Sequence, residues 1–278
     1  MIEPAQKDDA LLADIVSAQP GEGFALWWLG QSGFLIKHGE ACLLFDPYLS
    51  DSLTQKYADT DKPHVRMTRN PIEPARLTGI DVVTSSHNHT DHLDAQTLGP
   101  LLAANPNAAL VCPEANRQFV CDRLELDANK PIGLDAGEHV SIGPFTLHAV
   151  PAAHEELARD EHGRHHFLGY VARFGPWSMY HSGDTLWYDG IVDWLKPFDL
   201  DLALLPINGR RPERRVAGNL DGEQAADLAH QVGARCVVPC HYDMFTFNTE
   251  PPDCFIQACE KRAQPYRVPR CGERVTWP

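Results

Sequence analysis

One short segment of this 278-residue chain is dense in groups that bind metal ions. It follows an apolar run at 80–84, typical of a buried strand, and reads His87-Asn88-His89-Thr90-Asp91-His92. Imidazole nitrogens and carboxylate oxygens at this density suit zinc, manganese or iron(II). Because side chains alternate along an extended backbone, His87 and His89 point the same way. Asp91 and His92 can turn toward a second position as a helix begins, so one loop can serve two metal ions.

A less specific interpretation competes with this one. A single surface histidine is usually only solvated, and two histidines at i and i+2 often arise by chance. The full pattern directly after a buried-strand pattern is much rarer, so the metal interpretation is favoured.

Strand and helix patterns alternate along most of the chain. Short glycine turns separate the first strand patterns, and the later ones alternate with helical spacing. There is no repeat, low-complexity tract or linker. The pattern predicts an α/β fold over residues 1–278, a single domain in which helices cover β-sheets. The strands are expected at 24–29, 33–37, 42–45, 80–85, 109–112, 139–142, 144–150, 166–174, 177–181, 200–205, 235–239, 266–268 and 274–277, and the helices at 10–18, 93–103, 114–124, 188–195, 221–231 and 252–262.

One segment, 48–74, is polar and irregular and is long for a loop inside a compact domain. Loops of that length are often functional, for example as active-site lids.

Composition narrows the class of protein. A net charge of −14 argues against a nucleic-acid surface built from basic patches, although bound divalent cations would offset part of the excess. No apolar run reaches the length of a membrane span, and the N-terminus lacks a signal-peptide pattern. The eight cysteines form no C-x-x-C pair, and several lie in apolar runs typical of buried, reduced thiols. We therefore expect a cytoplasmic protein with no nucleic-acid or membrane partner.

Further donors stand where other strand patterns end. His154, Asp184 and His241 each follow such a pattern, which implies one rim of a sheet that collects ligands. Singly, each has an ordinary explanation: a surface histidine beside two glutamates, a turn-capping aspartate, and a buried histidine bonded to backbone. Together with 87–92 they complete a set of the right size for a dinuclear site. His148 and His181 are expected to orient a ligand or substrate.

This donor series resembles that of the metallo-β-lactamase superfamily, and the likeness spans nearly the whole chain. Residues 24–30, 180–184 and 276–278 are specifically similar to the L-ascorbate-6-phosphate lactonase branch. Residues 86–94 and 204–207 are also similar to the N-acylphosphatidylethanolamine phospholipase D branch. The chain departs from the lactonase in its length, in the segment before His154 and in the 208–215 loop.

The resemblance implies a four-layer αβ/βα sandwich, two mixed sheets flanked by helices, with the metals at one edge. It further implies that His87, His89 and His154 hold one divalent cation, that Asp91, His92 and His241 hold the other, and that Asp184 bridges them. Zinc and manganese suit these donors, and iron is compatible with them. Such cations can share a hydroxide that attacks a carbonyl carbon or a phosphorus, so Asp91 and Asp184 are the expected catalytic residues.

The substrate is less constrained by sequence. Asn208, Arg210 and Arg211 follow a strand pattern and can border the metal rim, where arginine suits phosphate or carboxylate. A charged surface loop in which Glu213 pairs with the arginines explains them equally well. Tyr242, with Asp243 and Phe245 after it, and His181 are further candidates for a small polar pocket.

The leading hypothesis is a metal-dependent hydrolase of a small anionic lactone or ester, of sugar type or phosphorylated. The alternatives are a phosphodiesterase or phospholipase-D-like hydrolase on the same metals, a metal-binding protein without turnover, and, less favoured, an iron oxidoreductase. A homo-oligomer is compatible with the sequence.

Overall fold

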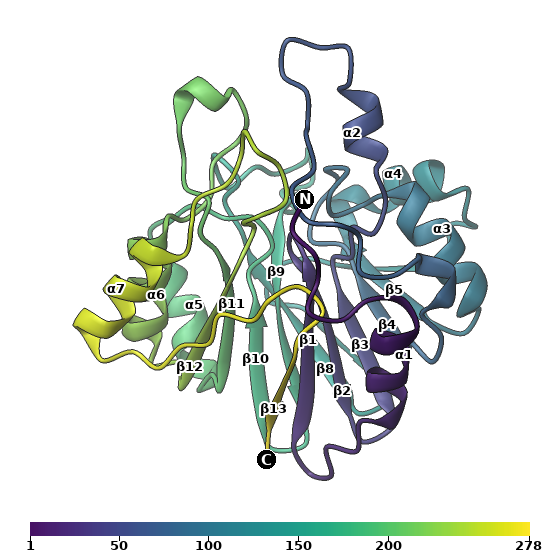
Figure 1. Ribbon diagram of the computed structural model, residues 1–278, viewed down its shortest axis with the longest axis horizontal. Helices are drawn as coiled ribbons and strands as arrows, with labels where there is room; N and C mark the ends of the chain where they lie inside the picture. Colours follow the sequence, from purple (N-terminus) through teal and green to yellow (C-terminus); the bar gives the residue numbers. More distant parts are fainter.

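The computed structural model describes residues 1–278 and contains two mixed β-sheets that lie face to face (Figure 1). The first has seven strands in the order β13-β1-β2-β3-β4-β5-β6. Their bounds are β1 Phe24–Gly30, β2 Gly33–His38, β3 Ala41–Phe45, β4 Val82–Thr84, β5 Ala109–Pro113, β6 Pro131–Leu134 and β13 Arg274–Trp277.

The second sheet has six strands in the order β12-β11-β10-β9-β8-β7. Strands β10, β11 and β12 run parallel to one another, and the remaining pairs are antiparallel. Their bounds are β7 His139–Ile142, β8 Phe145–Pro151, β9 Leu168–Phe174, β10 Trp177–His181, β11 Leu202–Pro206 and β12 Cys236–Cys240.

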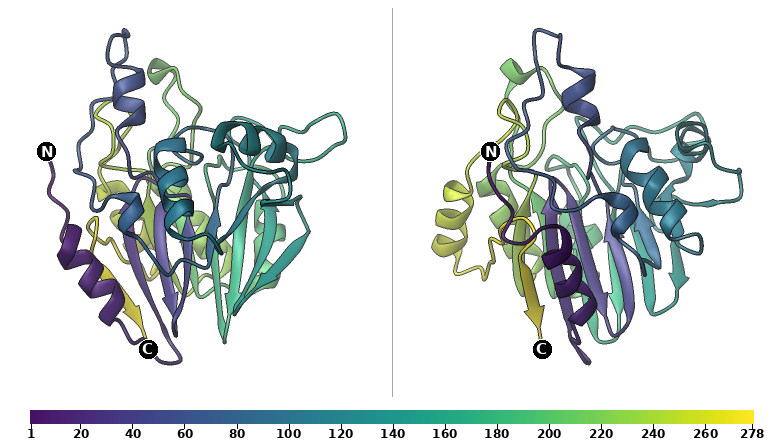
Figure 2. Two further views of the ribbon diagram at one scale, coloured as in Figure 1. Left: turned by 90° about the vertical axis from the view of Figure 1, so that its right-hand side faces the viewer. Right: turned by 45° about the vertical axis from the view of Figure 1, so that its right-hand side comes forward.

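Helices cover the outer face of each sheet, as two views of the molecule show (Figure 2). Helices α1, α3 and α4 pack on the first sheet, and α5, α6 and α7 pack on the second. The layered α/β sandwich expected from the sequence is confirmed. The helices are α1 Asp8–Ser17, α2 Ser52–Lys56, α3 Ala95–Ala104, α4 Arg117–Leu124, α5 Ile191–Leu195, α6 Gly222–Val232 and α7 Asp253–Arg262.

The alternation of side chains divides the core into two layers. On β1, Leu26 and Trp28 face the second sheet in a cluster of 45 buried residues. Ala25 and Trp27 point the other way, into a cluster of 22 buried residues beneath α1, α3 and α4. Since both faces of β1 are covered, its sequence is apolar throughout rather than alternating.

Several elements differ from expectation at their ends. Helix α4 begins only after a 3₁₀ turn at Glu114–Asn116, and α2 lies inside the stretch expected to be irregular. Strand β6, at the edge of the first sheet, was not predicted, because Pro131 and Gly133 interrupt its short apolar pattern. Residues 266–268 form a single bridge from Tyr266 to Val237 instead of a strand. No helix is both long and apolar enough to cross a bilayer.

Candidate metal centre

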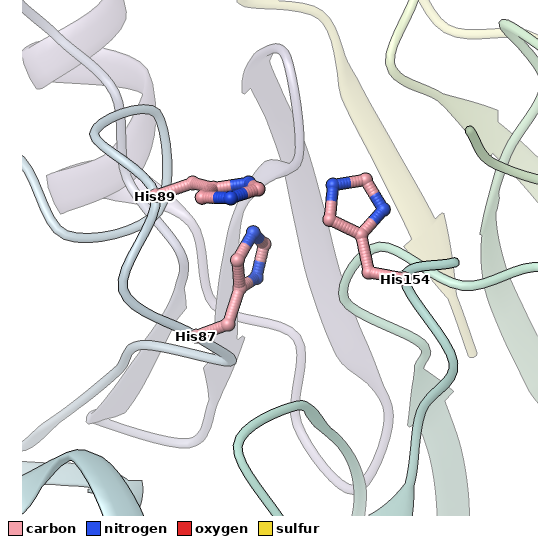
Figure 3. Close-up of side chains that lie close together, drawn as sticks. All are labelled: His87, His89 and His154. Atoms are coloured by element: carbon pink, nitrogen blue, oxygen red, sulfur yellow. The ribbon is translucent and has the colours of Figure 1, made fainter. Parts of the chain in front are cut away.

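The loops that follow β4, β8, β10 and β12 bring the donors together in two clusters. In the first, ligand atoms of His87, His89 and His154 all lie within 4.8 Å of one another (Figure 3). The second, within the same limit, contains Asp91, His92, Asp184 and His241. The structure thus brings together all seven residues expected to bind metal, in two sets.

Local hydrogen bonds shape the 87–92 loop. The backbone N–H groups of His92 and Leu93 both donate to the carbonyl of His89, at 3.1 and 2.8 Å, which turns the chain sharply. Arg123 donates to the carbonyl of Asn88 at 2.7 Å and fixes the loop against α4. The turn separates His87 and His89 from Asp91 and His92, so one loop contributes to both clusters.

Asp184 lies between the clusters. One carboxylate oxygen is 3.2 Å from Nε2 of His92, and the other is 3.3 Å from Nε2 of His241. The second oxygen is also 3.7 Å from Nε2 of His154, which belongs to the first cluster. Asp184 therefore lies within 4 Å of imidazole rings from both clusters.

Buried partners orient the rings from behind. Asp46 accepts a hydrogen bond of 2.7 Å from Nδ1 of His92, and both side chains are fully buried. His154 donates from Nδ1 to the carbonyl of Gly218 at 2.9 Å. Because these bonds occupy Nδ1, the Nε2 atoms face the clusters.

The donor set fits divalent cations. Nε2 of His87 is buried without a hydrogen-bond partner, and Nε2 of His92 makes no aligned hydrogen bond to the Asp184 oxygen that lies 3.2 Å away. Buried polar atoms are normally paired, so such atoms, one in each cluster, need an explanation. A cation at each cluster supplies it, because imidazole nitrogen and carboxylate oxygen are its usual ligands.

Electrostatics differ between the two clusters. Burial lowers the pKa of His154 to about 4 and also holds the pKa of His87 well below its usual value, so both rings are neutral at pH 7. Burial alone would lower the pKa of His241, but Asp184 and Asp91 outweigh it and raise that pKa to about 9. Without a cation, therefore, a proton on His241 offsets part of the negative charge of the second cluster.

Gln31 contributes an unpredicted side chain to the second cluster. Its amide nitrogen lies 2.7 Å from a carboxylate oxygen of Asp91 and 3.0 Å from Nε2 of His241. It stands in the turn between β1 and β2, whose sequence gives no signal of metal chemistry. Its contact with His241, which follows β12, is made because the two sheets pack face to face.

A cavity of about 380 Å³ opens above the clusters. Asp91 and Asp184 are its only acidic lining residues, and Lys56 and Arg123 its only lysine and arginine. The 48–74 segment reaches this cavity through α2 and the residues after it. The sequence did not single out the other cavity residues from this segment, Leu53, Tyr57 and His64.

Of the residues expected to bind substrate or shape its pocket, Phe245 lines this cavity. The others lie outside its lining: Asn208, Arg210, Arg211, Tyr242 and His181. Arg210 forms an ion pair with Glu155, and Arg211 pairs with Glu250 at 2.7 Å. Asn208 is buried and donates to Asn248. The Tyr242 hydroxyl donates to the carbonyl of Pro269.

Two other histidines are also accounted for by packing. His181 donates to the carbonyl of Ser32 at 2.8 Å and stacks on Phe45. His148 stacks on its cross-strand neighbour His139 and does not line the cavity.

Comparison with known proteins identifies the family to which this chain belongs. A family model described as a beta-lactamase superfamily domain matches residues 42–242. The chain belongs to the metallo-β-lactamase superfamily. The resemblance drawn from the donor series is therefore confirmed at that level.

Similar proteins are known across several organisms. The chain is 27% identical over 256 residues to a UPF0173 metal-dependent hydrolase of Opitutus terrae. The match covers 90% of this chain and 98% of the relative. A UPF0173 metal-dependent hydrolase of Aeropyrum pernix is 25% identical over 262 residues. That match covers 87% of this chain and 92% of the relative.

Solved structures share the fold. An isothiocyanate hydrolase from Delia radicum gut bacteria superimposes with a TM-score of 0.70 at 17% identity, covering 91% of this chain and 98% of that one. Igni18, a metallo hydrolase from Ignicoccus hospitalis, superimposes with a TM-score of 0.66 at 22% identity. The match covers 92% of this chain and 99% of that one.

Proposed function

We propose that this protein is a metal-dependent hydrolase that cleaves a small anionic lactone or ester. The observation that carries the proposal is the position of Asp184, which touches both donor clusters at the floor of a 380 Å³ cavity. The relatives named as metal-dependent hydrolases support the same reaction class.

His87, His89 and His154 would hold one divalent cation, and Asp91, His92 and His241 the other, with Asp184 shared. Zinc, manganese and iron suit this donor set. Such ions make water a nucleophile at neutral pH and stabilise negative charge on the oxygen of the bond that breaks.

The chain itself positions that chemistry. Asp46 and the Gly218 carbonyl fix the rings of His92 and His154. Gln31 restrains Asp91, whose carboxylate is placed to accept a proton within the cavity. Burial of the first cluster keeps its imidazoles unprotonated, which metal binding requires.

The cavity favours an anionic substrate once cations neutralise its two aspartates. Lys56 and Arg123 then remain as its charged lining groups. Lys56 is exposed on α2, and its ammonium lies 5.1 Å from the centroid of the Tyr57 ring with no carboxylate as partner, so it is available to an anion. A lactone or ester that carries a carboxylate or phosphate fits this distribution of charge.

The test is a hydrolysis screen on zinc- and manganese-reconstituted protein with sugar lactones, lactone phosphates and aryl phosphodiesters. Lactone or ester turnover is the expected result. Asp184→Asn should reduce bound metal and turnover together, whereas Asp193→Asn, an exposed change on α5, should alter neither. Turnover of phosphodiesters alone would replace the proposal with a phosphodiesterase, and full activity of Asp184→Asn with both metals bound would remove its bridging role.

A further inference from the structure

One side of the cavity is a continuous group of aromatic rings, here called the aromatic wall: Tyr57, His64, Phe245 and Phe247. His64 is its centre. Its ring stacks on Tyr57, with centroids 4.1 Å apart and planes 15° apart, and lies 4.4 Å from Phe247 and 5.2 Å from Phe245. The ammonium groups of Lys56 and Lys62 lie 5.1 and 5.5 Å from the ring centroids of Tyr57 and Phe247, so two cations border this group of rings.

The wall is built from two distant segments that are fixed to each other. The backbone N–H of Met67 donates to the carbonyl of Met244 at 2.8 Å, and that of Thr246 donates to the carbonyl of Val65 at 3.1 Å. Phe245 is only 2% exposed and packs near Tyr48. Backbone pairing on both sides of the rings makes the wall a preformed surface, although it lies in loops.

The wall and the metal clusters line the same cavity. Leu53, Val216 and Ala217 extend the apolar part of the lining. The cavity therefore has a polar end, where a bond can be hydrolysed, and an apolar end made mostly of rings. Ligand sites commonly combine an apolar lining with a few polar groups that set orientation.

We propose that the aromatic wall binds a flat apolar group of the substrate, an aryl or arylalkyl substituent on the ester or lactone. This inference rests on the proposed hydrolase function and specifies its substrate. Aromatic rings attract one another through offset and edge contacts in addition to the burial of apolar surface. A polyhydroxylated group has less apolar surface to bury against these rings and gains less free energy from the contact.

Binding of uncleavable acids tests the wall without turnover. On zinc-loaded protein, calorimetry compares 3-phenylpropanoate with 3-cyclohexylpropanoate and gluconate. We expect the phenyl acid to bind at least about tenfold more tightly than gluconate, equivalent to about 1.4 kcal/mol, and about threefold more tightly than the cyclohexyl acid. Equal affinity for the phenyl acid and gluconate would overturn the proposal, and equal affinity for the phenyl and cyclohexyl acids would overturn the requirement for a flat group.

Matched variants assign the effect to the wall. Phe247→Ala should remove most of the phenyl preference, Tyr57→Phe should keep it, and Trp194→Ala, an exposed aromatic on α5, should change nothing. Phe247→Leu, which retains apolar volume without a ring, replaces Phe247→Ala as the test variant if the alanine protein does not fold. An equal loss in Trp194→Ala and Phe247→Ala would contradict the assignment.

Ester kinetics separate this inference from the proposed function. Phe247→Ala should raise KM for phenyl acetate about tenfold and leave both KM for methyl acetate and bound zinc unchanged. If both esters are hydrolysed and Phe247→Ala changes their KM values equally, the wall is not the recognition surface, although the protein is a hydrolase. If neither ester is hydrolysed and the screen of lactones, lactone phosphates and phosphodiesters also shows no turnover, the hydrolase proposal fails; a phenyl acid preference that depends on Phe247 would still support binding at the wall.

Discussion

The side-chain amide of Gln31 donates a hydrogen bond of 2.7 Å to Asp91, sixty residues away in the chain. Gln31 is 1% exposed, its φ of +48° lies in the left-handed region, and its amide oxygen is buried without a partner. A non-glycine residue keeps such a conformation at a cost in free energy, and strain of this kind is concentrated at functional sites. The strain is maintained where the amide meets the second donor cluster.

Gln31→Ala is therefore expected to weaken metal binding at the second cluster. Residues that orient metal ligands typically contribute about 10- to 100-fold to affinity. Calorimetric titration with zinc should show one site weakened by about that factor and the other unchanged. Gln19→Ala, an exposed change, is the control, and equal zinc affinities in the Gln31 variant and the unmodified protein would contradict the role.

Asp46→Ala should affect both metal binding and stability. The Asp46 carboxylate accepts hydrogen bonds from Nδ1 of His92, the Thr84 hydroxyl and the Ser86 N–H. Its loss leaves these buried donors unpaired, at about 1–3 kcal/mol each. We expect a lower Tm of the metal-free protein and zinc affinity reduced by about 10- to 100-fold. A variant with unchanged zinc affinity and a lowered Tm would show that Asp46 acts only on folding.

The metal-free protein should lose stability between about pH 6.5 and 9. Asp184 and Asp91 raise the pKa of His241 from 6.5 to about 9 against the effect of burial. Because protonated His241 is favoured in the folded state, its contribution to the free energy of unfolding is complete below pH 6.5, the pKa in the unfolded chain. That contribution is lost as the pH rises through 9, the pKa in the folded state. Urea unfolding should show a decline of at most about 1.4 kcal/mol per pH unit for this proton.

Zinc should abolish that alkaline decline, because ligation requires neutral histidine and releases the proton. Zinc binding at pH 7 should accordingly release protons, measurable as a dependence of the binding enthalpy on the buffer. A metal-free protein whose stability is constant from pH 6.5 to 9 would contradict the buried ion pair of His241.

Arg210→Ala and Arg211→Ala should change KM less than about twofold. Both guanidiniums are more than half exposed and are paired with Glu155 and Glu250. Exposed ion pairs of this kind contribute about 0–1 kcal/mol. Lys56→Ala, in contrast, should raise KM for an anionic ester several-fold and leave KM for its neutral analogue unchanged. A large KM effect at Arg210 would favour the substrate role predicted from the sequence over this pairing.

The sequence by itself predicted a layered α/β fold and seven candidate donors, and the superfamily likeness added the arrangement in two sheets. The 80–84 run and the strands before Asp184 and His241 are apolar because both faces of those strands are covered. Their ends are polar, so pattern alone located His87, Asp184 and His241. The superfamily likeness then divided the donors into the two sets found in the structure.

Only the tertiary structure decided what surrounds those donors. Apolar periodicity reports that a side chain is buried but not which side chain it meets. Gln31 reaches Asp91 through the packing of a hairpin turn on a distant loop, and His64 meets Phe247 through backbone pairing of segments about 180 residues apart. Arg210 looked available to a substrate until the fold placed Glu155 beside it. Each relationship depends on long-range contacts, which no local pattern in the chain encodes.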